Sequence, residues 1–294
     1  MADPDPENDT MRALLLLLAL PVSALAQGMD IWLFDRSAEL KLVTRVTDRE
    51  GYDNQPAFTH DGKALLFSSD RAGEQIDLFR FVIATGEIEN LTNTPDENEF
   101  SPQDWRGEAL MFVLQEGVPY QHLWRRAWDG GERERALTSY VPVGYYARNE
   151  GGTLFWGRYA YALFHEAADA DVGPGAGESL RVIDQAGRSI HAIPDSMDFS
   201  FVHKQLDWQW VIKRLDPATG AITPLAPISN ANEDYCWTPD DQILMARGAT
   251  LLSFDPSGEN GWQEVGSLAA PGFETGGRCT VSRDGRHLAF VSPR

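Results

Sequence analysis

The chain has 294 residues, with 44 acidic and 25 basic side chains and a formal net charge of −19. A nucleic-acid-binding protein is expected to carry a basic stripe, and this sequence has none, so we exclude nucleic acid as a partner. Two cysteines, Cys236 and Cys279, are too few for a disulfide-dense scaffold.

The N-terminus resembles a secretory leader. Arg12 precedes an apolar run from Ala13 to Leu20, and the small-residue site Ala24-Leu25-Ala26 follows. This pattern is typical of a signal peptide cleaved after Ala26, and the apolar run is too short to span a bilayer. Residues 1–10 are acidic, and we interpret them as a misassigned start or an extension. We therefore expect a leader over 1–26, one domain over 27–294, no transmembrane segment in the mature chain, and a periplasmic or secreted location.

The clearest repeat runs from residue 55 to residue 92. It predicts strands over 56–59, 64–68, 76–82 and 88–91, with turns at Asp61-Gly62 and Thr85-Gly86. Four short strands in about 40 residues are typical of one propeller blade. A second unit repeats this order over residues 100–138.

The third and fourth units are less regular. Strands are predicted over 144–146 and 153–156, and residues 157–179 are interpreted as a long insertion before a third strand over 180–184. Residues 189–193 either end the third blade or begin the fourth. The fourth blade continues through 199–203, 210–215 and 222–225, which leaves one strand short or missing. The fifth is complete, with strands over 234–238, 242–246, 250–254 and 262–268.

The sixth unit shows only two strands, over 278–282 and 287–291, before the sequence ends. Residues 29–35 and 40–46 supply the two missing strands. The sequence therefore predicts an all-β, six-bladed β-propeller in which N-terminal strands complete the last blade and leave no long unpaired edge. Cys236 and Cys279 fall on the first strands of adjacent blades. They form a disulfide in an oxidising compartment or remain buried thiols.

The segment from Pro56 to Arg71, PAFTHDGKALLFSSDR, closely resembles the WD40-like PD40 repeat. This repeat occurs in TolB-type periplasmic propellers and in the propeller domains of prolyl-oligopeptidase-like peptidases. The match is specific in the first blade, good in the second, fifth and sixth, and poor in the third and fourth. We expect neither the N-terminal α/β domain of TolB nor an α/β-hydrolase domain, and the sequence has no Gly-x-Ser-x-Gly motif. The resemblance implies a propeller, a secreted location and protein binding, and it implies no catalytic residue.

In a propeller, the connections from an outer strand to the next inner strand run toward the axis. The loops predicted at that mouth are acidic, rich in amides and aromatic, which favours a binding surface that steers a basic partner. The alternative is that their Asp and Asn side chains bond their own loops. The candidate binding residues are Tyr52, Asp53, Asn54, Glu97, Asn98, Glu99, Tyr159, Tyr161, His203, Asn232, Glu233, Asp234, Tyr235 and Arg278.

Metal sites are weakly indicated. Two acidic groups, Asp96 with Glu97 and Glu99, and Asn232 with Glu233 and Asp234, offer oxygen ligands suited to calcium, without an EF-hand spacing. No histidine spacing favours zinc, so we predict no cofactor and leave Ca²⁺ open.

Our main hypothesis is a monomeric scaffold that binds a protein or peptide. The alternatives are an enzyme at the channel mouth, such as a hydrolase or lyase acting on a sugar or lactone, and a carbohydrate-binding module with a row of exposed tryptophans. Whether the protein is an enzyme stays open, and no catalytic residue is predicted.

Overall fold

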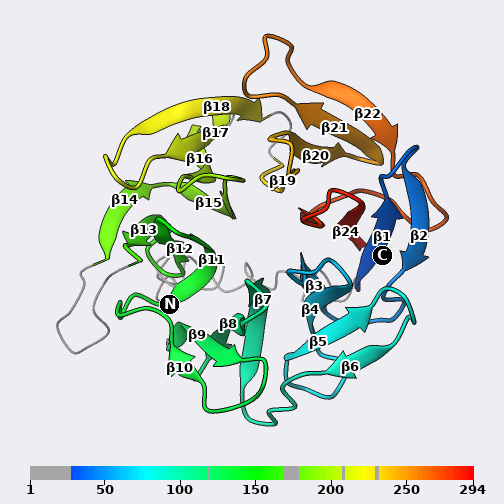
Figure 1. The fold of residues 1–294 in the computed structure, drawn as a ribbon, viewed down its shortest axis with the longest axis vertical. Coiled ribbons are helices and arrows are strands. Elements are labelled where there is room, and N and C mark those ends of the chain that lie inside the picture. The colour runs from blue at the N-terminus through cyan, green and yellow to red at the C-terminus, as the bar shows by residue number, and fades with distance from the viewer. Residues whose placement is uncertain (1–27, 118–119, 169–178, 207–208, 229–231) are drawn as a thin grey trace, which may run out of the picture.

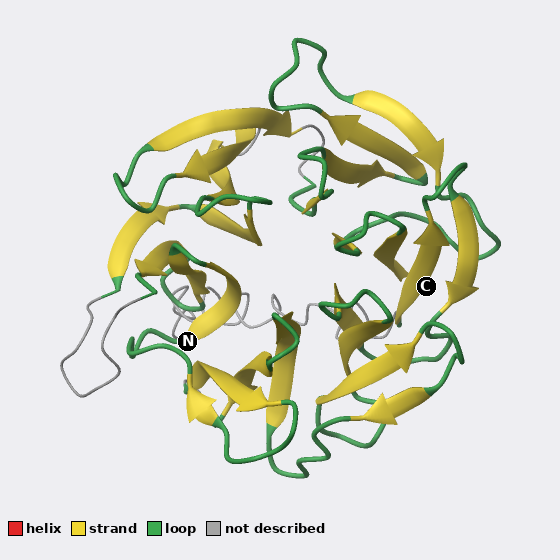
Figure 2. Cartoon of the chain, viewed as in Figure 1, coloured by secondary structure: helices red, strands yellow, loops and turns green. Residues whose placement is uncertain are grey.

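Six four-stranded sheets surround a central axis in the computed structural model (Figure 1). The structure describes residues 28–294 except 118–119, 169–178, 207–208 and 229–231. The predicted leader and the glycine-rich stretch 173–177 lie outside the described residues. Within the described part every regular element is a strand, as Figure 2 shows. The fold is therefore the predicted all-β, six-bladed propeller.

Each blade is an antiparallel sheet whose first strand lies nearest the axis (Figure 1). Blade one contains β3 (Asp53–Phe58), β4 (Ala64–Ser69), β5 (Asp77–Val82) and β6 (Ile88–Asn90). Blade two contains β7 (Asn98–Trp105), β8 (Ala109–Gln115), β9 (Gln121–Ala127) and β10 (Glu134–Arg135). Blade five contains β19 (Cys236–Trp237), β20 (Ile243–Arg247), β21 (Thr250–Phe254) and β22 (Gln263–Ser267). These three blades follow the predicted strand order.

Blade six joins the two ends of the chain. It contains β23 (Cys279–Val281), β24 (His287–Pro293), β1 (Met29–Asp35) and β2 (Lys41–Arg45). β1 pairs with β24 without interruption, from Met29 opposite Pro293 to Asp35 opposite His287. Ile31, Trp32, Leu33 and Phe34 of β1 are at most 2% exposed. The predicted closure is confirmed.

Blade three corrects the sequence interpretation. It contains β11 (Val143–Asn149), β12 (Gly152–Gly157), β13 (Ala162–Glu166) and β14 (Leu180–Asp184). The third strand is therefore β13, inside the predicted insertion, and residues 180–184 form the fourth strand. A tight turn joins β12 to β13, with Tyr161 at a φ of 50° where turns more often use glycine. The insertion is confined to the connection between β13 and β14.

Blade four is complete, so the prediction of a short or missing strand was wrong. It contains β15 (Ala186–Ala192), β16 (Phe199–Leu206), β17 (Gln209–Leu215) and β18 (Ile222–Ile228). Residues 189–193, which the sequence left between two blades, belong mainly to its innermost strand. That strand carries polar side chains because it borders the central channel.

The repeated Asp-Gly turns have a common hydrogen-bond pattern. Thr59 donates its hydroxyl to Asp61 at 2.8 Å and accepts the backbone N–H of Ala64 at 3.0 Å. In blade six, Ser282 makes the equivalent bonds to Asp284 and His287, at 2.6 and 2.8 Å. The glycine after each aspartate has a φ near 70°. The motif thus recurs because one hydroxyl closes each turn between the first and second strands.

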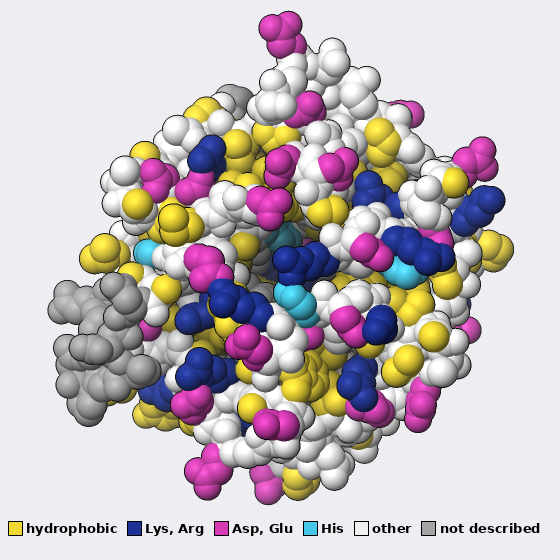
Figure 3. Space-filling model, in the orientation of Figure 1, with side chains coloured by type: hydrophobic (Ala, Val, Ile, Leu, Met, Phe, Trp, Pro, Cys, Tyr) yellow, Lys and Arg dark blue, Asp and Glu magenta, His cyan; other side chains and the backbone are white. Residues whose placement is uncertain are grey.

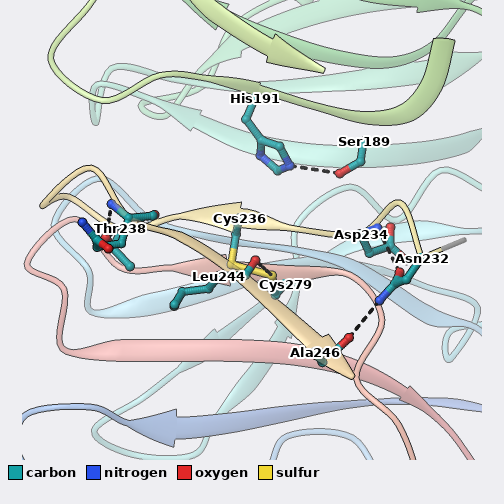
Figure 4. The surroundings of a disulfide bond; sticks show 10 residues. Ser189, His191, Asn232, Asp234, Cys236, Thr238, Leu244, Ala246 and Cys279 are labelled. Carbon is teal, nitrogen blue, oxygen red and sulfur yellow. Dashed lines mark hydrogen bonds between the residues drawn. A yellow bond between two sulfur atoms is a disulfide. The ribbon is translucent and has the colours of Figure 1, made fainter. Parts of the chain in front are cut away.

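The two cysteines form a disulfide, which resolves the alternatives left open by the sequence. Cys236 on β19 and Cys279 on β23 have Cα atoms 5.6 Å apart, so the bond joins the innermost strands of blades five and six (Figure 4). Both cysteines are almost completely buried. The disulfide therefore fastens the blade that closes the ring to its neighbour.

We predict that removing residues 27–47 unfolds the whole domain. Burial of the four apolar side chains of β1 contributes about 6–12 kcal/mol, which is comparable to the whole stability of an ordinary domain. Thermal unfolding followed by circular dichroism measures the effect, with removal of residues 1–26 alone as the control. A truncated chain that keeps the melting temperature of the control would contradict the closure.

The double variant Cys236→Ser/Cys279→Ser should lose about 4 kcal/mol of unfolding free energy, because the bond closes a long loop in the unfolded chain. The sequence separation of the two cysteines is 43 residues. Urea unfolding with and without a reductant measures the difference. Equal stability of the oxidised and reduced wild-type protein would show that the bond does not constrain the unfolded chain.

Candidate functional site

Two neighbouring cavities are lined by the innermost strands and by the connections between blades. The first, here called the mouth cavity, is lined by residues of the loops and connections that lead into the inner strands, and its volume is about 700 Å³. The second, the channel cavity, is lined by the innermost strands and their hairpin turns, and it also measures about 700 Å³. Gln55, Tyr145 and Arg188 line both cavities. The two cavities are therefore neighbours that share part of their walls.

Aromatic side chains are numerous in the wall of the mouth cavity. Its six aromatic side chains come from three different blades or their connections, and they are Tyr52, Phe100, Tyr145, Trp156, Tyr159 and Tyr161. Trp156 packs edge-on against Tyr161 with ring centroids 5.4 Å apart, and Tyr52 packs edge-on against Phe100 at 6.4 Å. Tyr159 and Tyr161 are 52% and 66% exposed. Rings that are fixed at one edge and exposed at the other suit contact with a partner.

Tyr159 and Tyr161 lie at this cavity as predicted, although on the β12–β13 loop and not on the long insertion. The neighbouring His165 and Glu166, also assigned to the insertion, are buried on β13. His165 contacts the carbonyl of Gly151 at 2.9 Å, and Glu166 accepts the backbone N–H of Thr138 at 2.8 Å. These two side chains hold the blade together and do not line either cavity.

Asp53 is fully buried beneath the mouth. Its two carboxylate oxygens accept from Arg49 at 3.1 Å and from Arg71 at 3.0 Å. Arg71 also lies over the ring of Phe67, 5.0 Å from its centroid. Since both oxygens of Asp53 are occupied by arginines, this carboxylate fixes the connection into blade one.

Glu97 and Glu99 have opposite environments. Arg133 donates to both oxygens of Glu97 at about 2.5 Å, and these hydrogen bonds lower the pKa of that carboxyl. Glu99 is 1% exposed and accepts from the hydroxyls of Thr92 and Thr94 at 3.1 and 2.6 Å. Burial raises its pKa to about 7, and the buried Asp77, which shares both threonines, adds to this.

Glu233 and Asp234 are also paired. Glu233 lies 3.1 Å from Lys204 and 3.6 Å from Arg188, and Asp234 accepts from Arg188 at 3.2 Å. Both carboxylate side chains are 11% exposed. The pairs join the connection before blade five to blade four, at the junction of the two cavities.

The predicted amides mainly stabilise loops, which is the alternative that the sequence left open. The side-chain oxygens of Asn54, Asn98 and Asn232 each accept a backbone N–H, from Gln55, Ile76 and Asp234 respectively, at 2.7–3.0 Å. Such bonds shape the connections into the inner strands. None of these three residues lines the mouth or channel cavity.

Tyr235 and His203 differ in their hydrogen bonding. Tyr235 is 1% exposed and donates its hydroxyl to Ser200 at 2.8 Å. His203 lies on β16, and its Nδ1 has no hydrogen-bond partner within the described part of the chain. Burial lowers the pKa of His203, so its imidazole is neutral at pH 7.

The channel cavity is basic, in contrast to the protein as a whole. Four arginines line it, Arg148, Arg188, Arg278 and Arg283, against the two aspartates Asp195 and Asp234. Figure 3 shows arginine or lysine side chains and histidines gathered around the central hollow. Of these arginines the sequence proposed only Arg278. Arg148 and Arg188 lie on innermost strands, where side chains can face the axis. Their positions in the sequence could therefore have predicted arginines in the channel.

No calcium or zinc cluster is evident from the described ranges. Within them no three His, Cys, Asp or Glu side chains come together as metal ligands. The carboxylates proposed for calcium include Glu97, Glu233 and Asp234, which already face arginines or a lysine. No helix in the described part of the chain has the length and apolar character needed to cross a membrane.

Comparison with solved structures shows a TolB-like propeller fold. A protein from Agrobacterium tumefaciens assigned as TolB aligns with a TM-score of 0.69 at 15% identity, over 92% of this chain and 99% of that one. A gluconolactonase from Xanthomonas campestris gives 0.60 at 14% identity, over 92% and 97%. An oligogalacturonate lyase from Vibrio parahaemolyticus gives 0.53 at 13%, over 90% and 97%. No family model and no curated protein matches the sequence. The likeness thus establishes the fold, which binding proteins and enzymes share.

We predict that Glu99 makes the fold less stable at pH 8 than at pH 5. Its carboxyl has a pKa of about 7 when folded and 4.5 as its ordinary value. The folded state therefore keeps a proton that the unfolded chain loses, and stability falls by about 3 kcal/mol as pH rises through this window. In Glu99→Gln this loss should disappear, as urea unfolding at both pH values would show.

Glu97→Gln is the matched control, because the lowered pKa of Glu97 places its titration below pH 5. This variant should keep the wild-type difference between pH 5 and pH 8. A Glu99→Gln protein that still loses the same stability as wild type would place the titrating group elsewhere.

Proposed function

We propose that this protein is a periplasmic or secreted binding protein that takes a segment of a protein or peptide partner into the mouth cavity. The observation that carries the proposal is the set of six aromatic side chains around one hollow of about 700 Å³. Tyrosine and tryptophan beside arginine are the side chains that most often dominate binding energy at protein interfaces. The leader-like residues 1–26 and the TolB-like fold support the location and the binding role.

The aromatic wall is favoured over the acidic residues as the binding surface. The acids proposed from the sequence face cations or are buried, so little free negative charge remains at the mouth to attract a basic partner. Steering of a basic partner stays a prediction. In the proposal, apolar and aromatic contact supplies the affinity, while Gln185 and Arg158 offer hydrogen bonds at the rim.

A carbohydrate-binding surface has less support. All the tryptophans that the structure describes are at least partly buried, so they make no exposed row of stacking rings. The protein acts as a monomer in this proposal, because one chain supplies all six blades and both cavities.

The test is capture of a partner from a periplasmic extract, followed by its identification and by titration of the purified pair. Tyr159→Ala/Tyr161→Ala should weaken binding about 1,000-fold, since each anchor side chain contributes about 2 kcal/mol. The matched control is Tyr140→Ala, because Tyr140 is 75% exposed and does not line the cavity. Equal affinity of the two variants would reject the mouth cavity as the binding surface. Saturable binding of an oligosaccharide in place of a protein would overturn the assigned ligand class.

A further inference from the structure

Arg278 differs from every other arginine of the channel cavity. Arg188 faces the carboxylates of Glu233 and Asp234. Arg148 donates to the hydroxyl of Thr153 at 2.6 Å, and Arg283 contacts the ring of His60 at 2.6 Å. For the guanidinium of Arg278, the described residues offer one contact only, the face of Tyr145, whose centroid lies 4.8 Å from Cζ. Its N–H groups are therefore free to donate.

Arg278 is half-buried, so the lack of a nearby carboxylate is energetically unfavourable for its guanidinium. Its side chain is half-buried in the wall of a cavity that carries more arginines than acids. Taking a guanidinium partly out of water without a carboxylate costs free energy, and an anion entering the cavity would recover it. Low-dielectric walls also concentrate the field of the arginines inside the cavity. The protein as a whole carries a net charge of −19, so this field is local to the axis.

The groups around Arg278 suit an anion. His191 on β15 borders the same cavity, and Ser189 lies 3.1 Å from its Nε2 (Figure 4). Burial and the nearby Arg278 lower the pKa of His191 to about 4, so its ring is neutral at pH 7. Tyr52 lines the mouth cavity, and burial raises the pKa of its hydroxyl although Arg278 and Arg188 are near, so the hydroxyl keeps its proton.

Arg278 also lies where a segment from the mouth would arrive. Tyr145, against which it stacks, lines both cavities, as does Arg188. A chain anchored among the aromatic side chains of the mouth would therefore present its next residue at the entrance of the channel cavity.

We propose that the channel cavity is a carboxylate-binding site, in which Arg278 pairs with an acidic side chain or chain terminus of the segment held at the mouth. The proposal rests on the proposed function for the origin of the carboxylate, but the site itself is a property of this chain. A planar guanidinium offers two parallel N–H groups, which fit the two oxygens of a carboxylate. Its contact with the ring of Tyr145 limits the positions open to the guanidinium.

The site can be tested with glutarate as the probe, by calorimetric titration of the full-length protein. Glutarate should bind wild type saturably, and Arg278→Gln should weaken binding about tenfold or more, the scale of a charge-assisted hydrogen bond. Arg278→Lys keeps the charge without the planar fork, and it should recover only part of the affinity. The melting temperature of each variant would show that it is folded.

Arg283→Gln is the matched control, because it removes the same charge from the same cavity wall. This variant should bind glutarate nearly as well as wild type. Equal weakening in Arg278→Gln and Arg283→Gln, equal binding of the neutral dimethyl ester, tighter binding of inorganic phosphate, or no saturable binding would each overturn the proposal.

The two proposals can fail separately. Tyr159→Ala/Tyr161→Ala should bind glutarate as wild type does, because neither tyrosine lines the channel cavity. If the double tyrosine variant loses partner capture but binds glutarate normally, both proposals are supported. If the wild-type protein binds glutarate but captures no partner, the proposed function is rejected and the carboxylate site remains.

Discussion

The pairing of β1 with β24 is the contact on which the rest of this propeller depends. Every other blade is built from consecutive strands, whereas blade six exists only when the two ends of the chain meet. The cavities depend on the same contact, because the channel needs all six innermost strands at fixed positions around the axis. The side chains of β1 that are buried on one face belong to the core shared with blade one, and those on the other face to the core shared with blade five. Loss of this pairing would therefore disturb three blades and both cavities together.

The charge of the channel at the axis is opposite in sign to the net charge of the sequence. An acidic sequence suggests an acidic surface at any opening. The acids that the sequence analysis proposed for the mouth, however, mostly form salt bridges, with Arg49, Arg71, Arg133, Arg188 and Lys204. These pairs order the loops that approach the axis. Among the residues that line the channel cavity, the arginines outnumber the aspartates, and of the two aspartates Asp234 already faces Arg188, so the channel is positive although the protein as a whole is negative.

Much of the fold could be predicted from the sequence, because its strongest signals are local. The bonds of Thr59 to Asp61 and of Ser282 to Asp284 span only two residues, and they repeat with the turns. β13 was missed because its five residues are all buried and its preceding turn uses Tyr161 in place of a glycine. Ser101 of β7 occupies the same position in its blade as Gln55 of β3. Each residue has a positive φ, 53° for Ser101 and 58° for Gln55, and each interrupts the pairing between the first and second strands of its blade.

The site was less accessible to such reasoning, because its properties depend on residues far apart in the sequence. Glu97 meets Arg133 across 36 residues, and Asp234 meets Arg188 across 46. A pattern of residue types reveals which loops approach the axis, and it placed Tyr52, Tyr159, Tyr161 and Arg278 there. It does not reveal which charges are neutralised, because that depends on the register and twist of neighbouring blades.

In the proposed periplasmic or secreted location, the disulfide between β19 and β23 has a consequence for the order of assembly during export. A chain that crosses a membrane from its N-terminus delivers β1 first and β24 last, so β1 spends the whole of translocation without its partner strand. An apolar strand with an open edge is prone to pair with other chains. Once Cys279 has joined Cys236, β23 is anchored beside the finished blade five, and β24 folds back on it as a hairpin. Oxidation thereby prepares a rigid template for the waiting strand, which shortens the time during which this edge is open to aggregation.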